Sequence, residues 1–166
     1  MKKLTLIAFS LLVLLVPSMV LAADLMSDQT TVVGSVEFQF VDGKLFANFT
    51  LAPEGVWLLN EIHVQATDDP TKFPAKNGNP TPGKFAVGVK IDPAVKTYSA
   101  EIPLPAGAAS GSTLYIAAHA ELIAPSTDPL IPSTYESAWA FGATFPGKNW
   151  LPTQPLLCRN RVNMLP

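Results

Sequence analysis

The sequence predicts an all-β fold, a single antiparallel β-sandwich of immunoglobulin-like type with about seven to eight strands after an N-terminal signal peptide. Apolar and polar residues alternate with a period of two in several short segments, and turn-forming residues separate these segments. The 16 prolines of the 166-residue chain disfavour long helices. No segment after the signal peptide combines helical periodicity with capping residues. A small β-barrel is the alternative architecture.

The first 22 residues have the features of a secretory leader. Lys2 and Lys3 form a basic start, an apolar run covers residues 4–16, and Ala22 and Ala23 flank the expected cleavage site. That run of about 13 residues is shorter than the roughly 20 that cross a bilayer, so cleavage is favoured over a membrane anchor. We expect a secreted or cell-surface protein without a membrane span in its mature chain. Its sandwich domain covers residues 23–150, and a divergent tail, ordered or disordered, covers residues 151–166.

Charge and cysteine content exclude several classes of partner and site. Without Lys2 and Lys3 the mature chain has 9 basic residues against 13 acidic ones, and this weak acidity disfavours binding to nucleic acid. The chain contains one cysteine, Cys158, so neither an internal disulfide nor a zinc site of several thiolates can form. Cys158 is either a tail thiol without a role or half of an intermolecular bridge.

Two segments predict a β-hairpin near the start of the mature chain. In residues 32–41, Val36, Phe38 and Phe40 share one face, as expected for a strand with one buried side. The dipeptide Asp42-Gly43 follows, which tolerates the positive φ angles of a tight turn, and apolar alternation resumes in residues 45–51. These segments should pair.

Five further segments predict strands, at residues 56–66, 85–91, 97–104, 113–123 and 135–142. For residues 56–66 the expected inner face comprises Val56, Leu58, Ile62 and Val64, and the expected outer face comprises Trp57, Leu59, Glu61, His63 and Gln65. For residues 113–123 the expected inner face comprises Leu114, Ile116, Ala118, Ala120 and Leu122, and the expected outer face comprises Tyr115, Ala117, His119 and Glu121.

Residues 67–84 contain four prolines and two glycines and are predicted to be a long loop without regular structure. Within this loop, Asp68, Asp69, Asn77 and Asn79 could supply the oxygen ligands that a calcium ion requires. The spacing does not match an EF-hand, and turn formation with solvation explains the same residues.

The most suggestive chemical pattern is Glu61-x-His63 in one strand and His119-x-Glu121 in another. Residues two apart on a strand share a face, so each pair is juxtaposed, and all four side chains converge if the two strands are neighbours. Imidazole and carboxylate suit zinc or another divalent transition metal. The alternative is that each pair is a hydrogen-bonded polar pair on a half-buried strand. If the strands lie in different sheets, the site does not exist.

Aromatic residues offer a further hypothesis, a stacking platform for a glycan. The six candidates are Trp57, Trp139 and Trp150 with Tyr98, Tyr115 and Tyr135. Packing in the core and at sheet edges is the alternative for all of them.

Five blocks of sequence together resemble a poorly characterised module of secreted and surface-attached bacterial and archaeal proteins. The blocks are residues 55–64 (GVWLLNEIHV), 78–85 (GNPTPGKF), 116–120 (IAAHA), 136–139 (ESAW) and 145–150 (FPGKNW). The resemblance covers roughly residues 31–150 and implies an all-β extracellular domain, often one unit of a longer surface protein, with no established enzymatic activity. Similar modules continue into another β-like run after the position of Trp150. A missing final strand here would leave an open sheet edge that another chain could pair with.

These observations favour a non-catalytic domain for adhesion or ligand recognition, with a cell-surface protein or a glycan as partner. The sequence has no Gly-x-Ser-x-Gly elbow, no phosphate-binding glycine loop and no His-Glu-x-x-His motif. One alternative is a small metal-dependent hydrolase that uses Glu61, His63, His119 and Glu121. Another is a structural subunit of a surface assembly that associates through its open edge strand.

Overall fold

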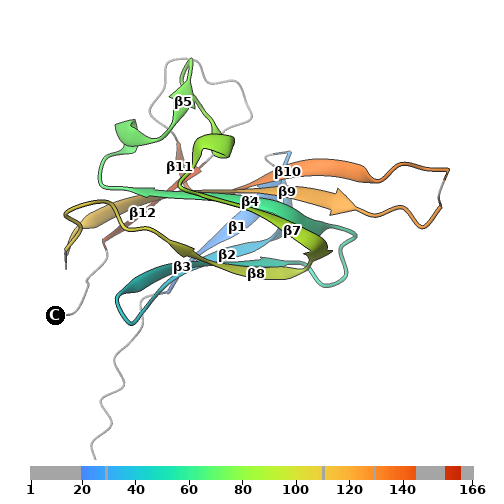
Figure 1. Cartoon of the computed structure of the whole chain (residues 1–166), viewed down its shortest axis with the longest axis horizontal. Coiled ribbons are helices and arrows are strands. Elements are labelled where there is room, and N and C mark those ends of the chain that lie inside the picture. The colour runs from blue at the N-terminus through green and yellow to red at the C-terminus, as the bar shows by residue number, and fades with distance from the viewer. Residues whose placement is uncertain (1–19, 29, 110, 129, 145–155, 162–166) are drawn as a thin grey trace, which may run out of the picture.

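The computed structural model describes residues 20–28, 30–109, 111–128, 130–144 and 156–161, and this part of the chain is all-β (Figure 1). The elements in chain order are β1 (Val20–Ser27), β2 (Thr31–Val41), β3 (Lys44–Leu51), β4 (Leu58–Thr67), η1 (Pro70–Lys72), β5 (Ala75–Lys76), β6 (Asn79–Pro80), η2 (Pro82–Lys84), β7 (Val87–Val95), β8 (Thr97–Ile102), β9 (Thr113–Ala124), β10 (Thr134–Ala140), β11 (Ala143–Thr144) and β12 (Leu156–Arg161). Each segment that the sequence predicts as a strand overlaps an observed strand. In the described residues, no helix has the length and apolar character needed to cross a membrane.

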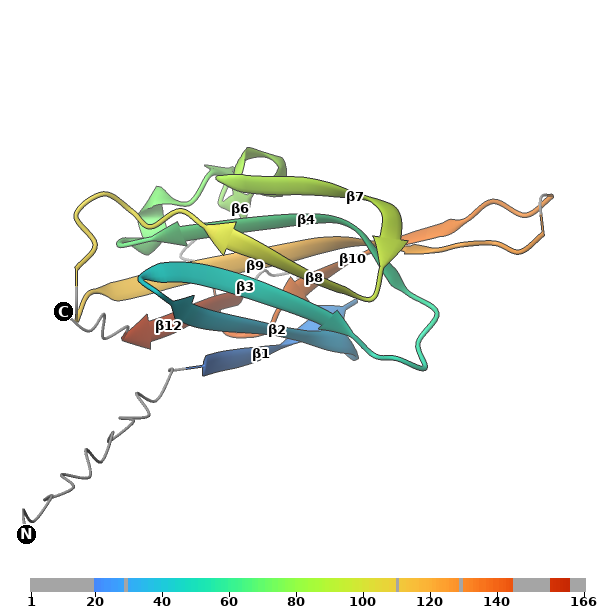
Figure 2. The same ribbon diagram turned by 60° about the horizontal axis from the view of Figure 1, so that its bottom comes forward.

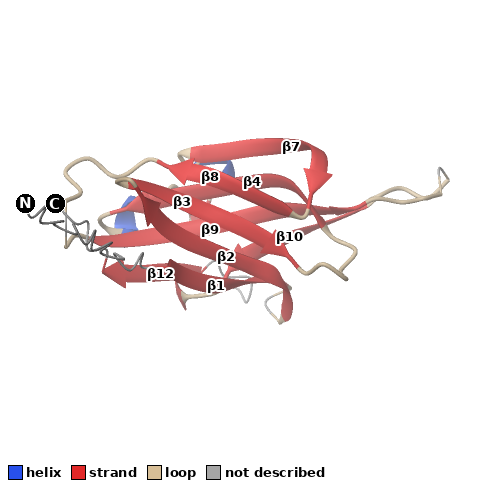
Figure 3. Cartoon of the chain, turned by 90° about the horizontal axis from the view of Figure 1, so that it is seen from below, coloured by secondary structure: helices blue, strands red, loops and turns tan. Residues whose placement is uncertain are grey.

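Ten of the strands form one antiparallel sheet that folds over on itself (Figures 2 and 3). Strands β8, β3, β2 and β1 are neighbours in that order, and β1 then pairs with β10. Strand β9 pairs with β10 and β12 along one edge and with β4 along the other, and β7 lies beyond β4. The sheet is nearly barrel-shaped, which is consistent with both the predicted sandwich and the barrel alternative.

The apolar faces of the folded sheet meet in one core. Its largest fully buried side chains are Phe49, Leu25, Leu45, Leu59, Ile62, Ile102, Leu114, Ile116, Leu122, Val36 and Val64. They come from strands on both sides of the fold, and burial of each stabilises the native state by about 1.5 to 3 kcal/mol. The predicted inner face of residues 113–123 is confirmed, because all five of its side chains are buried.

The turn between β2 and β3 is the predicted tight hairpin. Asp42 and Gly43 have φ angles of 50° and 76°, and Val41 pairs directly with Lys44. Two successive positive φ angles give the turn the twist that antiparallel strands require.

Strand β4 differs from its predicted inner face at the start of the strand. Leu59 is fully buried although it was expected to face outward, whereas Leu58 is only partly buried and Val56 is 69% exposed. The register against β9 shifts between Leu59 and Glu61, so Asn60 is an extra residue in the ladder. This β-bulge inverts the alternation on its N-terminal side, and the prediction is correct only beyond it, at Ile62 and Val64.

The segment that follows β4 is more regular than the predicted loop. It contains η1, the β5–β6 hairpin and η2, and Figure 1 shows it standing above the sheet beside β4. Asn77 and Gly78, with φ angles of 53° and 81°, form the turn of the hairpin. Since a 3₁₀ helix of three residues leaves no apolar periodicity, the sequence pattern does not reveal it.

Both ends of the described chain contribute strands that the sequence did not predict. Strand β1 begins at Val20 and pairs with β2, where Ala22 lies opposite Glu37 and Ala23 opposite Val36. Cleavage after Ala22 would therefore leave Ala23 to Ser27 of this strand. Strand β12 pairs with β9, so part of the tail, which the sequence left as either ordered or disordered, adds a strand to the sheet. Cys158 lies in β12, paired with Ile116.

Replacing Ile116 or Phe38 by Asp should prevent folding, because these side chains are 1% and 3% exposed and a carboxylate there would have no partner. Loss of the β-sheet circular-dichroism signal and of dispersed amide resonances would report the effect. Val41→Asp is the control, since Val41 lies in the same strand as Phe38 but is 42% exposed. A folded Ile116→Asp protein would contradict the assignment of this core.

Candidate functional site

Strands β4 and β9 are neighbours, as the predicted convergence of the Glu61–His63 and His119–Glu121 pairs requires. Glu61 lies directly opposite Glu121, and His63 lies directly opposite His119. Residues opposite one another in an antiparallel pair point to the same side of the sheet. All four side chains therefore share a small area on the outer face of the β4–β9 pair, away from the main core.

Within this area the side chains form two His–Glu pairs. His63 Nε2 lies 3.3 Å from Glu61 Oε1, and His119 Nε2 lies 3.5 Å from Glu121 Oε1. The two imidazole rings are 5.6 Å apart with an angle of 31° between their planes. Because each carboxylate faces its own histidine, the four groups do not surround a common point. In the part of the chain that the structure describes, no group of three or more His, Cys, Asp or Glu side chains is arranged to hold a metal ion.

His119 is buried by its neighbour on β10. Trp139 lies opposite it in the ladder, with ring centroids 4.4 Å apart, and His119 is only 4% exposed. Its Nδ1 atom has no hydrogen-bond partner among the described residues. Burial, followed by the nearby His63, lowers the pKa of His119 to about 3. The ring is therefore neutral at ordinary pH.

The carboxylates form the next row of the same face. Burial raises the pKa of Glu121, Glu61 and Glu136 raise it further, and His63 opposes the shift. On β7, Lys90 lies opposite Glu61, but within the described residues it forms no ion pair.

The outer face is covered beside the histidines by the segment that follows β4. Phe73 and Phe85 form a second apolar cluster with Ala117, which is fully buried, and Tyr115 and Trp139 pack against it. The Ala86 N–H donates to Gln65 Oε1 at 2.8 Å, which fixes the end of this segment to β4. Period-two alternation predicts Ala117 and His119 to face outward and cannot show that another part of the chain covers them.

Glycine on β7 leaves room for the first histidine. Gly88 lies opposite His63, and a Cβ atom at this position would approach His63 Nδ1 to 3.3 Å. That distance is shorter than an ordinary van der Waals contact, so a side chain at this position would require the ring to shift by a few tenths of an ångström. Gly88 is a site residue that sequence reasoning missed, because no turn or repeat marks it.

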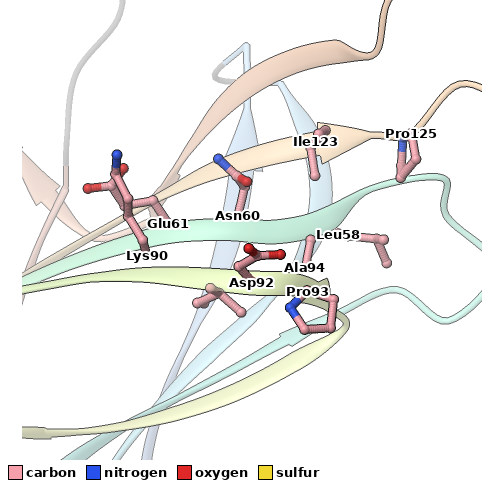
Figure 4. A pocket seen from close by; sticks show the side chains of 10 residues that line it. Leu58, Asn60, Glu61, Lys90, Asp92, Pro93, Ala94, Ile123 and Pro125 are labelled. Carbon is pink, nitrogen blue, oxygen red and sulfur yellow. The ribbon is translucent and has the colours of Figure 1, made fainter.

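A cleft of about 560 Å³ opens next to this row of side chains (Figure 4). It forms because β7 has four residues, 91–94, where β4 has only Asn60 between Leu59 and Glu61. Strand β7 therefore bows away from β4. The residues around the cleft are Leu58, Asn60, Glu61, Lys90, Ile91, Asp92, Pro93, Ala94, Ile123 and Pro125. Asp92-Pro93 lies inside β7, which continues beyond the strand that the sequence predicts at residues 85–91.

The calcium candidates have other partners. Lys72 Nζ forms an ion pair with Asp68 and donates a hydrogen bond to its Oδ1 at 2.8 Å. This hydrogen bond is the main cause of the lowered pKa of Asp68. Asp69 caps η1, where its carboxylate accepts from the Thr71 N–H at 2.8 Å, and this bond lowers its pKa. Asn77 and Asn79 lie in the β5–β6 hairpin. The turn-forming role that the sequence left open explains these residues.

The five aromatic candidates within the described residues do not form one platform. Trp57 and Tyr98 pack against the main core, whereas Trp139 and Tyr115 pack against the second apolar cluster. Tyr135 is 63% exposed on β10, and Trp150 lies outside the described residues.

Comparisons with protein-family models, with curated proteins and with solved structures found no match to this chain. The resemblance to a surface module therefore stays a prediction. Three of its blocks nevertheless fall on the site: residues 55–64 include most of β4, residues 116–120 lie in β9, and residues 136–139 lie in β10.

The native state should lose stability on acidification because of His119. Its pKa in the folded chain is about 3, against the ordinary histidine value of 6.5. Since the folded pKa is the lower one, the unfolded chain binds the proton first as the pH falls below about 6.5. This group alone should then lower the free energy of unfolding by about 1.4 kcal/mol for each pH unit, down to about pH 3.

Urea denaturation at several pH values tests this linkage. His119→Phe should flatten the decline between pH 6 and pH 4, whereas His63→Gln, which leaves the buried ring in place, should keep most of it. An equal decline in wild type and His119→Phe would show that His119 is not the responsible group.

Proposed function

We propose that this chain is an exported, non-catalytic recognition domain that attaches to a cell-surface partner through the outer face of β4, β7 and β9. The cleft between the bulged segments of β4 and β7 is the observation that carries the proposal. Its volume of about 560 Å³ lies in the range of pockets that hold small ligands or a short segment of a partner.

The composition of the cleft supports binding. An amide, an ammonium and two carboxylates, from Asn60, Lys90, Glu61 and Asp92, stand among aliphatic and proline walls. In Figure 4, Asn60, Glu61 and Lys90 extend to the same side of the sheet. A few polar groups within an apolar surround are typical of sites that fix the orientation of a ligand.

The surrounding framework supports a preformed site. The His–Glu pairs, the buried ring of His119 and the second apolar cluster lie on the same face and pack against one another. Residues held by such packing lose little conformational entropy when a partner binds. The histidines then serve as supports for the site rather than as its reactive groups.

Export and surface location are part of the same proposal. The basic and apolar residues of the first 22 positions are those of a secretory leader, and the five sequence blocks resemble a module of surface proteins. A chain with one cysteine and no internal disulfide would obtain its extracellular stability from the core rather than from cross-links.

A binding screen of the mature chain tests the proposed function. Residues 23–166, fluorescently labelled, would be applied to arrays of glycans and of cell-surface proteins. Asn60→Ala with Lys90→Ala should weaken any specific signal by at least roughly tenfold, since two oriented polar contacts are removed. Lys44→Ala is the matched control, because Lys44 is an exposed lysine on β3 that pairs with Glu101 at 2.8 Å. Binding that the double variant leaves unchanged would contradict a site in the cleft.

A further inference from the structure

The aliphatic wall of the cleft continues onto β10. Leu58 of β4 and Ile123 of β9 both line the cleft, and they lie directly opposite one another in the β4–β9 ladder. Ile123 in turn lies opposite Tyr135 of β10. Because opposite residues of an antiparallel pair point to the same side of the sheet, Tyr135 extends this row of side chains beyond the cleft on the same face.

Tyr135 differs from the other aromatic residues of β9 and β10 on this face. Its side chain belongs to a residue that is 63% exposed, whereas Tyr115 and Trp139 pack against the second apolar cluster. Within the described residues, Tyr135 forms neither a hydrogen bond nor a ring contact. The fold therefore leaves one flat apolar ring face open to solvent beside the cleft, with a hydroxyl at its end.

The polar side chains of the cleft are also left free by the fold. Within the described residues, those of Asn60, Lys90 and Asp92 form no hydrogen bond or ion pair. Glu61 contacts His63 through Oε1. An amide both donates and accepts hydrogen bonds, an ammonium group only donates, and a carboxylate only accepts. The cleft thus offers donors and acceptors together, next to aliphatic and proline walls.

The charges of the lining select against ionic ligands. Glu61 and Asp92 would repel an anion, and Glu121 lies directly opposite Glu61. Lys90 would repel a simple cation from the same space. A neutral molecule with several hydroxyl groups meets neither repulsion. Each of its hydroxyls can accept a hydrogen bond from an amide or ammonium group and donate one to a carboxylate.

We propose that the cleft and Tyr135 together bind a neutral oligosaccharide. The inference rests on the proposed function, because it assigns a ligand class to the same cleft. Sugar hydroxyls contact the polar groups of the lining, and the C–H face of a sugar ring packs on Tyr135 and Ile123. From β7 across β4 and β9 to β10 the site crosses three strand spacings, roughly 15 Å. This extent exceeds one sugar ring and favours a chain of several units.

Isothermal titration calorimetry of residues 23–166 tests the ligand class. The probes are neutral hexasaccharides of glucose, galactose, mannose and N-acetylglucosamine, each compared with its monosaccharide and with a form whose C6 hydroxyls are oxidised to carboxylates. We expect at least one neutral hexasaccharide to bind. Its monosaccharide and its oxidised form should each bind at least roughly tenfold more weakly, because the first is too short and the second is repelled by the carboxylates.

Substitutions of Tyr135 test the ring contact. Tyr135→Ala should weaken binding of the same hexasaccharide about tenfold, whereas Tyr135→Phe keeps the ring and should stay within about threefold of the wild type. Phe141→Ala is the matched control, because Phe141 is 54% exposed and lies six positions further along the chain, roughly 20 Å away. It should leave the affinity unchanged. Unaltered circular dichroism would establish that each variant is folded.

Three outcomes would overturn the inference: no binding of any neutral hexasaccharide at about 1 mM, equal affinity for the oxidised form, or a Tyr135→Ala protein that binds like the wild type. The proposed function fails separately. A surface protein from the arrays that binds through Asn60 and Lys90, without any bound saccharide, removes only the saccharide. A saccharide that binds equally to the wild type and to the Asn60→Ala, Lys90→Ala protein removes the cleft, and the proposed function with it.

Discussion

The pairing of β4 with β9 is the contact on which the rest of the structure depends. Ile62 and Val64 of β4 point into the main core from one face of this pair, and His63 points away from the other face. Both faces are covered, the first by the opposite side of the folded sheet and the second by Phe73 and Phe85. A slip of one residue would exchange these faces, so the apolar pattern fixes the register and, with it, the positions of His63 and His119.

Sequence periodicity predicts most strands because one face of each strand is buried and the other is exposed to solvent. The prediction fails where both faces are buried or where the alternation is interrupted. Ala117 is small and apolar at an expected outer position, and it is buried because a distant segment folds over it. Leu59 is buried because the extra residue Asn60 shifts the alternation, and a bulge has no fixed sequence signature. Strand β1 overlaps the predicted leader, whose apolar composition hides the start of a strand.

The candidate site was likewise predictable from the sequence only in part. The two Glu–His spacings predict juxtaposed pairs, and the structure places these pairs opposite one another. Their division into two separate pairs depends on side-chain orientation, which spacing alone does not encode. The cleft depends on a difference in length between two strands that are distant in sequence, where residues 91–94 of β7 stand against Asn60 of β4. Such a difference becomes visible only once the partners are known.

The overlap of β1 with the expected cleavage site links maturation to folding. Strand β1 connects the two halves of the sheet, since it pairs with β2 on one side and with β10 on the other. Leu21 and Ala22, on the leader side of the expected cleavage site, pair only with β2, whereas Leu25 to Ser27 form the ladder with β10. Cleavage at the predicted site would therefore shorten the contact with β2 and keep the whole ladder that joins the two halves of the sheet.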